Sequence, residues 1–296
     1  MRNTWNAKWA LAGGAALTTA IFAVVPQAKA TDSFSVSELA HHTHIHGLAV
    51  DRKDPAYLLI ATHHGLFRAG PDGKAVRISV VQDFMGFNAH PSDPNTLFAS
   101  GHPAQGGNLG FITSADQGKT WTHISPGVNG PVDFHQMTVS AADPCTIYGA
   151  YRGIQISRDG GKTWKLVGPE PEKLIALGAS AKSADTVYAA AEAGLLVSKD
   201  AGKTWNALLK GTPATFVEVT PDSIIYTFLV GRGLLRSPEE PLKFTDLGND
   251  FGAGFLLHFA IDPRDPNRLF AATSRGRVLM SNDQGRTWNS FGSPKS

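Results

Sequence analysis

The chain has 296 residues, of which 42% are hydrophobic and 18% charged, and its formal net charge is +2. Arg2, Lys8 and Lys29 fall in the first thirty positions, which contain no acidic residue, so the rest of the chain carries a net charge of −1 and no nucleic-acid partner is expected. Cys145 is the single cysteine, which excludes an intramolecular disulfide, and no apolar stretch after position 30 is long enough to span a bilayer.

The first thirty residues are typical of a cleavable secretory signal. Arg2 and Lys8 supply its positive start, Trp9–Val25 is apolar and rich in small residues, and Ala28–Ala30 has the small-x-small pattern of a cleavage site. We therefore expect residues 1–30 to be removed, a mature chain that begins at Thr31, and a periplasmic or secreted protein.

From residue 44 onward the chain repeats one pattern about every forty residues. Each unit has an apolar strand, a turn that is most often Asp-Pro, a second strand, a third strand opened by Gly and a closing strand. Four short strands per unit predict a β-propeller blade, so we expect one all-β domain at 44–292 after a lead-in at 31–43. Phe34–Val36 either adds an outer strand to the last blade and closes the ring, or marks a partial seventh blade. The six units are 44–78, 84–124, 133–167, 174–208, 214–247 and 256–291.

Four units close with the motif S-x-D-x-G-[KR]-T-W. Trp205 and Trp288 are about twice as far apart as the other consecutive motif tryptophans, so a degenerate unit lies between them, with Phe244 where its Trp would be. In the first unit, Pro71–Lys74 replaces the motif. The four copies are Ser114–Trp121, Ser157–Trp164, Ser198–Trp205 and Ser281–Trp288.

This motif resembles the Asp-box, or BNR repeat, of sialidase-like and sortilin-like β-propellers. The chain is also similar to exported bacterial BNR-repeat proteins and, in outline, to the photosystem II assembly-factor propellers. The resemblance implies an all-β propeller of six or seven blades, with Asp-box hairpins on the rim and away from the ligand. It does not imply one activity, because these propellers include hydrolases, sorting receptors and assembly factors.

The histidines gather at positions that share one face of a propeller. These positions are the entry to a blade's first strand and the loop between its second and third strands. Residues i and i+2 of an extended segment project to the same side, so His44 and His46 are expected to point together. The set from the first three blades is His42, His44, His46, His63, His64, His102 and His135. His258 and Glu218 lie on the same predicted face.

Several imidazoles from different loops suit copper, zinc or nickel. Met85 and Met137 lie near the predicted cluster and would suit Cu(I). The sequence therefore predicts a metal ion at the channel mouth, with copper favoured over zinc.

Three arginines occupy one repeat position, just before the Gly that opens the third strand: Arg152, Arg232 and Arg275. Guanidinium forks bind carboxylate or phosphate groups, so these residues predict an anion site. The alternative is that they bond carbonyl groups at the channel mouth.

Sialidases use three arginines as well, together with a Tyr nucleophile, its Glu partner and an acid. Tyr151 and Glu192 occupy equivalent positions in adjacent blades, and Asp133 is available as the acid, which makes these three the candidate catalytic residues. However, the R-I-P setting of the first sialidase arginine is absent, since Ser79 follows Arg77-Ile78.

Three functions follow from these patterns. The leading hypothesis is an exported propeller that binds a metal ion, in metal handling or as a binding protein rather than as a hydrolase. The second is a glycoside hydrolase that acts on an anionic sugar. The third is a metal-free scaffold or assembly factor that docks a partner protein.

Overall fold

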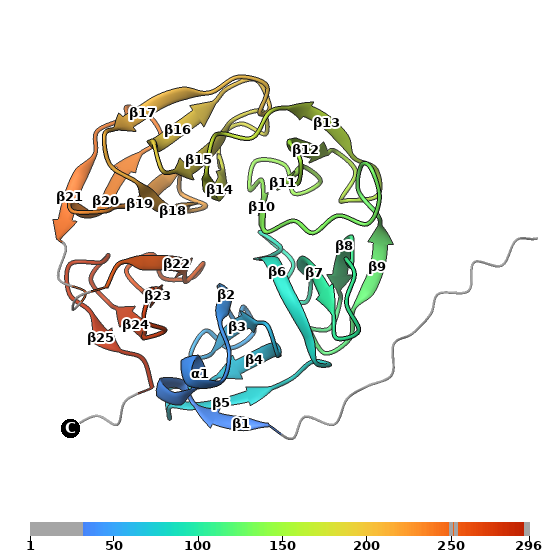
Figure 1. Cartoon of the computed structure of the whole chain (residues 1–296). Helices are drawn as coiled ribbons and strands as arrows, with labels where there is room; N and C mark the ends of the chain where they lie inside the picture. The colour runs from blue at the N-terminus through green and yellow to red at the C-terminus, as the bar shows by residue number, and fades with distance from the viewer. Residues whose placement is uncertain (1–31, 249–250, 252–253, 293–296) are drawn as a thin grey trace, which may run out of the picture.

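The computed structural model describes residues 32–248, 251 and 254–292. Its strands form six antiparallel blades arranged in a ring, as Figure 1 shows. The predicted signal lies outside the described residues. The helix of the described part, α1 (Val36–His42), is short, and no described helix has the length and apolarity to cross a bilayer.

The blades share one order, in which successive strands run from the centre of the ring outward. The innermost strands are β2 (Ile45–Val50), β6 (Gln82–Ala89), β10 (Gln136–Val139), β14 (Leu174–Ala179), β18 (Ala214–Val219) and β22 (Leu256–Ile261). The second strands are β3 (Leu58–Thr62), β7 (Leu97–Pro103), β11 (Ile147–Ala150), β15 (Val187–Ala191), β19 (Ile224–Leu229) and β23 (Leu269–Thr273).

The third and fourth strands complete each blade toward the rim. The third strands are β4 (Gly65–Ala69), β8 (Phe111–Ser114), β12 (Ile154–Ser157), β16 (Gly194–Ser198), β20 (Gly233–Pro238) and β24 (Val278–Ser281). The fourth strands are β5 (Lys74–Arg77), β9 (Thr122–Ser125), β13 (Lys165–Gly168), β17 (Asn206–Lys210), β21 (Thr245–Gly248) and β25 (Asn289–Ser290).

The N-terminal segment does not pair with the last blade, and that expectation was wrong. β1 (Ser33–Ser35) pairs antiparallel with β5, with Phe34 opposite Ala75, and so becomes the fifth strand of the first blade. Six blades therefore complete the ring. The physical reason is α1, whose buried Val36 and Leu39 join a cluster of side chains from the first and last blades. Packing by this helix, rather than strand pairing, covers the seam where the ring closes.

The core of the protein consists of the seams between neighbouring blades. A blade covered on both faces needs apolar residues on both faces, and β3, β15 and β23 are buried at every position. Aromatic rings fill one seam, where Phe84 lies 4.7 Å from Trp121 between ring centroids.

The Asp-box hairpins join third and fourth strands, at the opposite end of each blade from the predicted histidine face. In the third box, Ser198 Oγ accepts the Gly202 N–H at 2.8 Å and donates to Asp200 Oδ1 at 2.7 Å. Asp200 also accepts the N–H and hydroxyl of Thr204 at 3.0 and 2.6 Å. The corresponding bonds, led by the Thr163 hydroxyl, lower the pKa of Asp159 to about 2. The polar groups of each box thus find their hydrogen-bond partners within the same turn.

In the fifth blade, a different contact replaces the lost box. Glu239 is 5% exposed and accepts the Tyr188 hydroxyl at 3.0 Å and the Ala181 N–H at 3.2 Å, both from the fourth blade. The degenerate hairpin is therefore fixed by its neighbour rather than by its own side chains.

Replacing Ser198 by Ala tests the box as a structural element. The change leaves the buried Gly202 N–H without its acceptor, so the free energy of unfolding should fall by about 1–3 kcal/mol. Urea denaturation measures it, with the exposed Lys199→Ala in the same hairpin as the control. Equal stabilities of the two variants would contradict the role of the box.

Candidate metal centre

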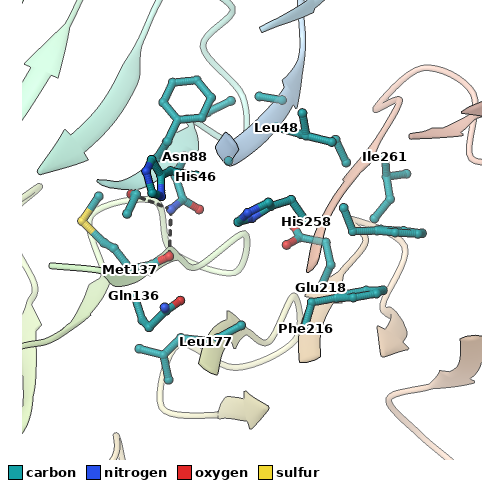
Figure 2. A pocket seen from close by; sticks show the side chains of 18 of the residues that line it. His46, Leu48, Asn88, Gln136, Met137, Leu177, Phe216, Glu218, His258 and Ile261 are labelled. Atoms are coloured by element: carbon teal, nitrogen blue, oxygen red, sulfur yellow. Dashed lines mark hydrogen bonds between the residues drawn. The ribbon is translucent and has the colours of Figure 1, made fainter. Parts of the chain in front are cut away.

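The six innermost strands surround a channel cavity of about 170 Å³. Side chains from different blades point into it (Figure 2). His46 stands at the start of β2 and Arg52 lies just beyond its end, so these two cavity-lining residues mark opposite ends of the channel. The His46 end is the face on which the histidines were expected to gather.

At this end, His46, His63 and Asp83 form a first cluster. Their candidate ligand atoms all lie within 4.8 Å of one another. His63, in the turn after β3, places Nδ1 2.8 Å from Asp83 Oδ2, and His46 Nε2 lies 3.7 Å from Asp83 Oδ1. His46 Nε2 and Asp83 Oδ1 are buried without a hydrogen-bond partner among the described residues. A bound ion between them would supply the partner that these two atoms lack.

His102, Asp133 and His135 form a second cluster beside the first. Asp133 Oδ2 lies 2.9 Å from His102 Nε2 and 2.5 Å from His135 Nε2. Asp133 is 6% exposed, and its Oδ1 has no partner in the described part of the chain. Asp83 and His102 are directly opposite in the β6–β7 pair, so the two clusters share one pair of strands.

The two clusters repeat one arrangement in consecutive blades. In each, a His at the end of a blade's second strand meets an Asp at the entry to the next blade: His63 with Asp83, and His102 with Asp133. Both Asp residues precede a fully buried Phe, Phe84 or Phe134, which anchors the backbone that carries the carboxylate. Asp83 was missed by sequence analysis, although the shared Asp-Phe pair at two blade entries is a signal for it.

Hydrogen bonding fixes the His102 ring in a form suited to metal binding. Its Nδ1 lies 2.7 Å from the Gly107 carbonyl, so Nδ1 carries the proton and donates it. In a neutral ring, the lone pair of Nε2 then faces the Asp133 carboxylate, an arrangement that needs a proton or a cation between them. Ligating histidines commonly donate their second N–H in this way.

The pKa of one histidine is shifted in each cluster, in opposite directions. Burial, followed by the nearby His63, lowers the pKa of His46 to about 3, so this ring is neutral at pH 7. The hydrogen bond with Asp133 raises the pKa of His135 above its ordinary value. Because imidazole binds metals in its neutral form, a metal ion at the second cluster would compete with protonation of His135.

Glu218 on β18 and His258 on β22 point into the middle of the channel (Figure 2). Burial raises the pKa of Glu218 to about 8, so its carboxyl is largely protonated at pH 7. His258 Nε2 donates to the Ile45 carbonyl at 2.9 Å, and burial lowers the pKa of this ring to about 4. Glu218 and His258 thus add two neutral polar groups to the channel wall.

Three of the seven predicted ligands lie outside both clusters. His42 stacks on Phe34, with ring centroids 4.3 Å apart, and His64 Nδ1 donates to the His42 carbonyl at 3.2 Å. His44 is exposed, and its ring centroid lies 5.5 Å from that of His63. Met137 lines the channel.

The three arginines remain separate. Arg152 is exposed over the Tyr151 ring at 5.4 Å, and Arg232 Nε donates to Asp246 Oδ1 at 2.9 Å on the outer strand of its own blade. Arg275 is exposed, and none of the three lines the channel cavity. The three arginines therefore do not form one site, and their binding of an anion remains a prediction.

The candidate catalytic residues also have separate partners. Asp133 is held between two histidines. Tyr151 accepts the Asn108 Nδ2 hydrogen bond at 3.4 Å, and Glu192 forms an ion pair with Lys173. No hydrogen bond joins Tyr151 to Glu192 in the described part of the chain.

Comparison with known proteins identifies the repeat. Residues 155–166, which include the second box, match the family model described as BNR/Asp-box repeat, and no curated protein matches the chain. Together with the six blades, this match makes the chain a six-bladed β-propeller with BNR/Asp-box repeats.

Solved structures share the fold at low identity. A GH74 enzyme from Niastella koreensis has 15% identity and a TM-score of 0.60 over 84% of this chain, which spans only 45% of that enzyme. A gluconolactonase from Xanthomonas campestris has 13% identity and a TM-score of 0.59 over 80% of this chain and 85% of its own. YCF48 from Cyanidioschyzon merolae has 17% identity and a TM-score of 0.52 over 84% of each chain. These likenesses concern the fold alone.

Replacing Glu218 by Gln tests the neutral carboxyl in the channel. Above its ordinary pKa of 4.5 the unfolded chain loses this proton, whereas the folded chain keeps it up to about pH 8. The unfolded state therefore binds fewer protons in this window, and the wild type should lose stability as the pH rises from 5 to 8. Over that range, urea denaturation should show the free energy of unfolding of Glu218→Gln rising relative to that of the wild type. The exposed Glu172→Gln serves as the control, and parallel pH profiles for all three proteins would contradict the assignment.

Proposed function

We propose that this protein binds two metal ions at the channel mouth, one at His46, His63 and Asp83 and one at His102, Asp133 and His135. The observation that carries the proposal is the repeated convergence of two imidazoles on a carboxylate, with buried ligand atoms that lack partners. Two imidazoles and one carboxylate are an established ligand set for catalytic zinc and non-haem iron, and they leave coordination positions open.

The ligand chemistry favours a divalent ion. Each cluster combines imidazole nitrogen with a hard carboxylate oxygen, whereas Cu(I) prefers the soft sulfur ligands that Met85 and Met137 were expected to offer. Among divalent ions, Cu²⁺ binds nitrogen and oxygen sites more tightly than Zn²⁺. We therefore propose Cu²⁺ as the preferred ion, with Zn²⁺ as the alternative.

The proposed setting is outside the cytoplasm, after removal of residues 1–30. Sites with exposed histidines such as His63 and His135 are accessible to exchange with the medium. The role that fits this arrangement is metal handling or metal-dependent binding by an exported protein.

Two alternatives have some support. Glycoside hydrolysis is supported by the fold likeness to a GH74 enzyme, but its candidate residues Asp133, Tyr151 and Glu192 have separate partners in this chain. A role in docking a partner protein is supported by the likeness to YCF48, one structure of which is described as bound to the D1 peptide and has 17% identity and a TM-score of 0.54. Neither alternative accounts for the paired His–Asp clusters.

Elemental analysis of the mature protein tests the proposal. After loading with Cu²⁺ or Zn²⁺ and dialysis, the wild type should retain two ions per chain. The double variant His63→Ala/Asp83→Asn and the double variant His102→Ala/Asp133→Asn should each retain one, because each loses two of the three ligands of a single site.

The control is His123→Ala, which removes an exposed imidazole on the outer strand β9. This variant should retain two ions. A wild type that keeps no ion, or a control that loses as much as the cluster variants, would overturn the proposal. In the first case, turnover of aryl glycosides and capture of a periplasmic protein become the decisive assays for the two alternatives.

A further inference from the structure

Each metal cluster has room for a further ligand. Three protein atoms hold each proposed ion, whereas four is the usual number for zinc, so at least one position remains for water or another molecule. His46 from the first cluster and His135 from the second both line the channel cavity. A molecule inside the channel is therefore next to both clusters.

The charge at this end of the channel favours an anion. Imidazole binds a metal ion in its neutral form, and each cluster contains a single carboxylate, Asp83 or Asp133. Neutral imidazoles and one carboxylate leave a bound divalent ion with a net charge of +1 at each cluster. Two such centres side by side attract a carboxylate group, because a bound cation is the largest local charge in its site.

Glu218 and His258, which also line the channel, are neutral at pH 7. The carboxyl of Glu218 has no recorded hydrogen-bond partner among the described residues, and its raised pKa makes it an O–H donor as well as an acceptor. The His258 ring donates through Nε2 to Ile45, so its Nδ1 is an acceptor. A donor and an acceptor of this kind match the hydroxyl groups of a ligand.

The volume and the apolar lining of the cavity limit the size of a molecule that can bind in it. Leu48, Phe216 and Phe259 contribute to the cavity wall, and Phe216 stacks on Phe259 with ring centroids 4.8 Å apart. A cavity of about 170 Å³ has room for several waters or one small organic molecule.

We propose that the channel binds a small hydroxycarboxylate, whose carboxylate completes the coordination of a metal ion at the mouth and whose hydroxyl groups reach Glu218 and His258. This inference rests on the proposed metal function and adds the class of ligand. It assigns Glu218 to ligand recognition and leaves the metal ligands unchanged.

Calorimetric titration of the Zn²⁺-loaded mature protein tests the inference with two acids of equal carbon number. Glycerate carries two hydroxyl groups and propionate carries none. Glycerate should bind the wild type about five- to tenfold more tightly than propionate, as expected for one or more added hydrogen bonds. Glu218→Leu should bind the two acids equally, and Glu218→Gln, which keeps a donor and an acceptor, should retain the preference.

Metal content measured on the same samples separates this inference from the metal proposal. If two ions are retained but glycerate shows no preference over propionate, or no acid binds, the ligand inference is overturned and the metal proposal stands. If Glu218→Leu keeps both ions and the full preference, the assignment of Glu218 is wrong. If the wild type retains no ion and binds neither acid, both proposals fail.

Discussion

Packing between neighbouring blades is the constraint on which the rest of this structure depends. No four-stranded sheet here is covered by its own side chains, so each must bury both faces against its neighbours, and the ring must close for the first and last blades to do so. Helix α1 provides that closure by placing Val36 and Leu39 over the final seam. Because the seams fix the distance and angle between blades, they also fix which loops of adjacent blades meet.

The candidate metal clusters are a direct consequence of this seam geometry. Phe84 and Phe134 are fully buried at two blade entries, and the Asp before each of them is held at the end of the same seam. The preceding blade then brings His63 or His102 to that carboxylate. A single repeat therefore cannot form the site, since each cluster takes ligands from two blades. The first and second blades form one cluster, and the second and third blades form the other.

The sequence was sufficient for the parts that depend on local chemistry. The Ser, Asp, Gly and Thr of each box satisfy one another within eight residues, so their hairpins and the six blades could be predicted from the motif and its spacing. Contacts between segments far apart in the sequence could not be predicted in this way. Strand β1 pairs with the free edge of β5, and the His42 ring stacks on Phe34. The repeat pattern of the sequence indicates neither contact. Asp83 was not predicted as a ligand, since its partners His46 and His63 belong to the preceding blade.

Buried ligand atoms of the two clusters have no hydrogen-bond partner among the described protein groups. Asp83 Oδ1, Asp133 Oδ1 and His46 Nε2 are buried without partners among the described residues, and each such group costs about 1–3 kcal/mol relative to a satisfied one. A fold selected for stability alone would replace them by apolar side chains. An ion that binds only the folded chain would offset this cost and stabilise the ring. The proposed ions would give these buried atoms partners at the entries of two consecutive blades.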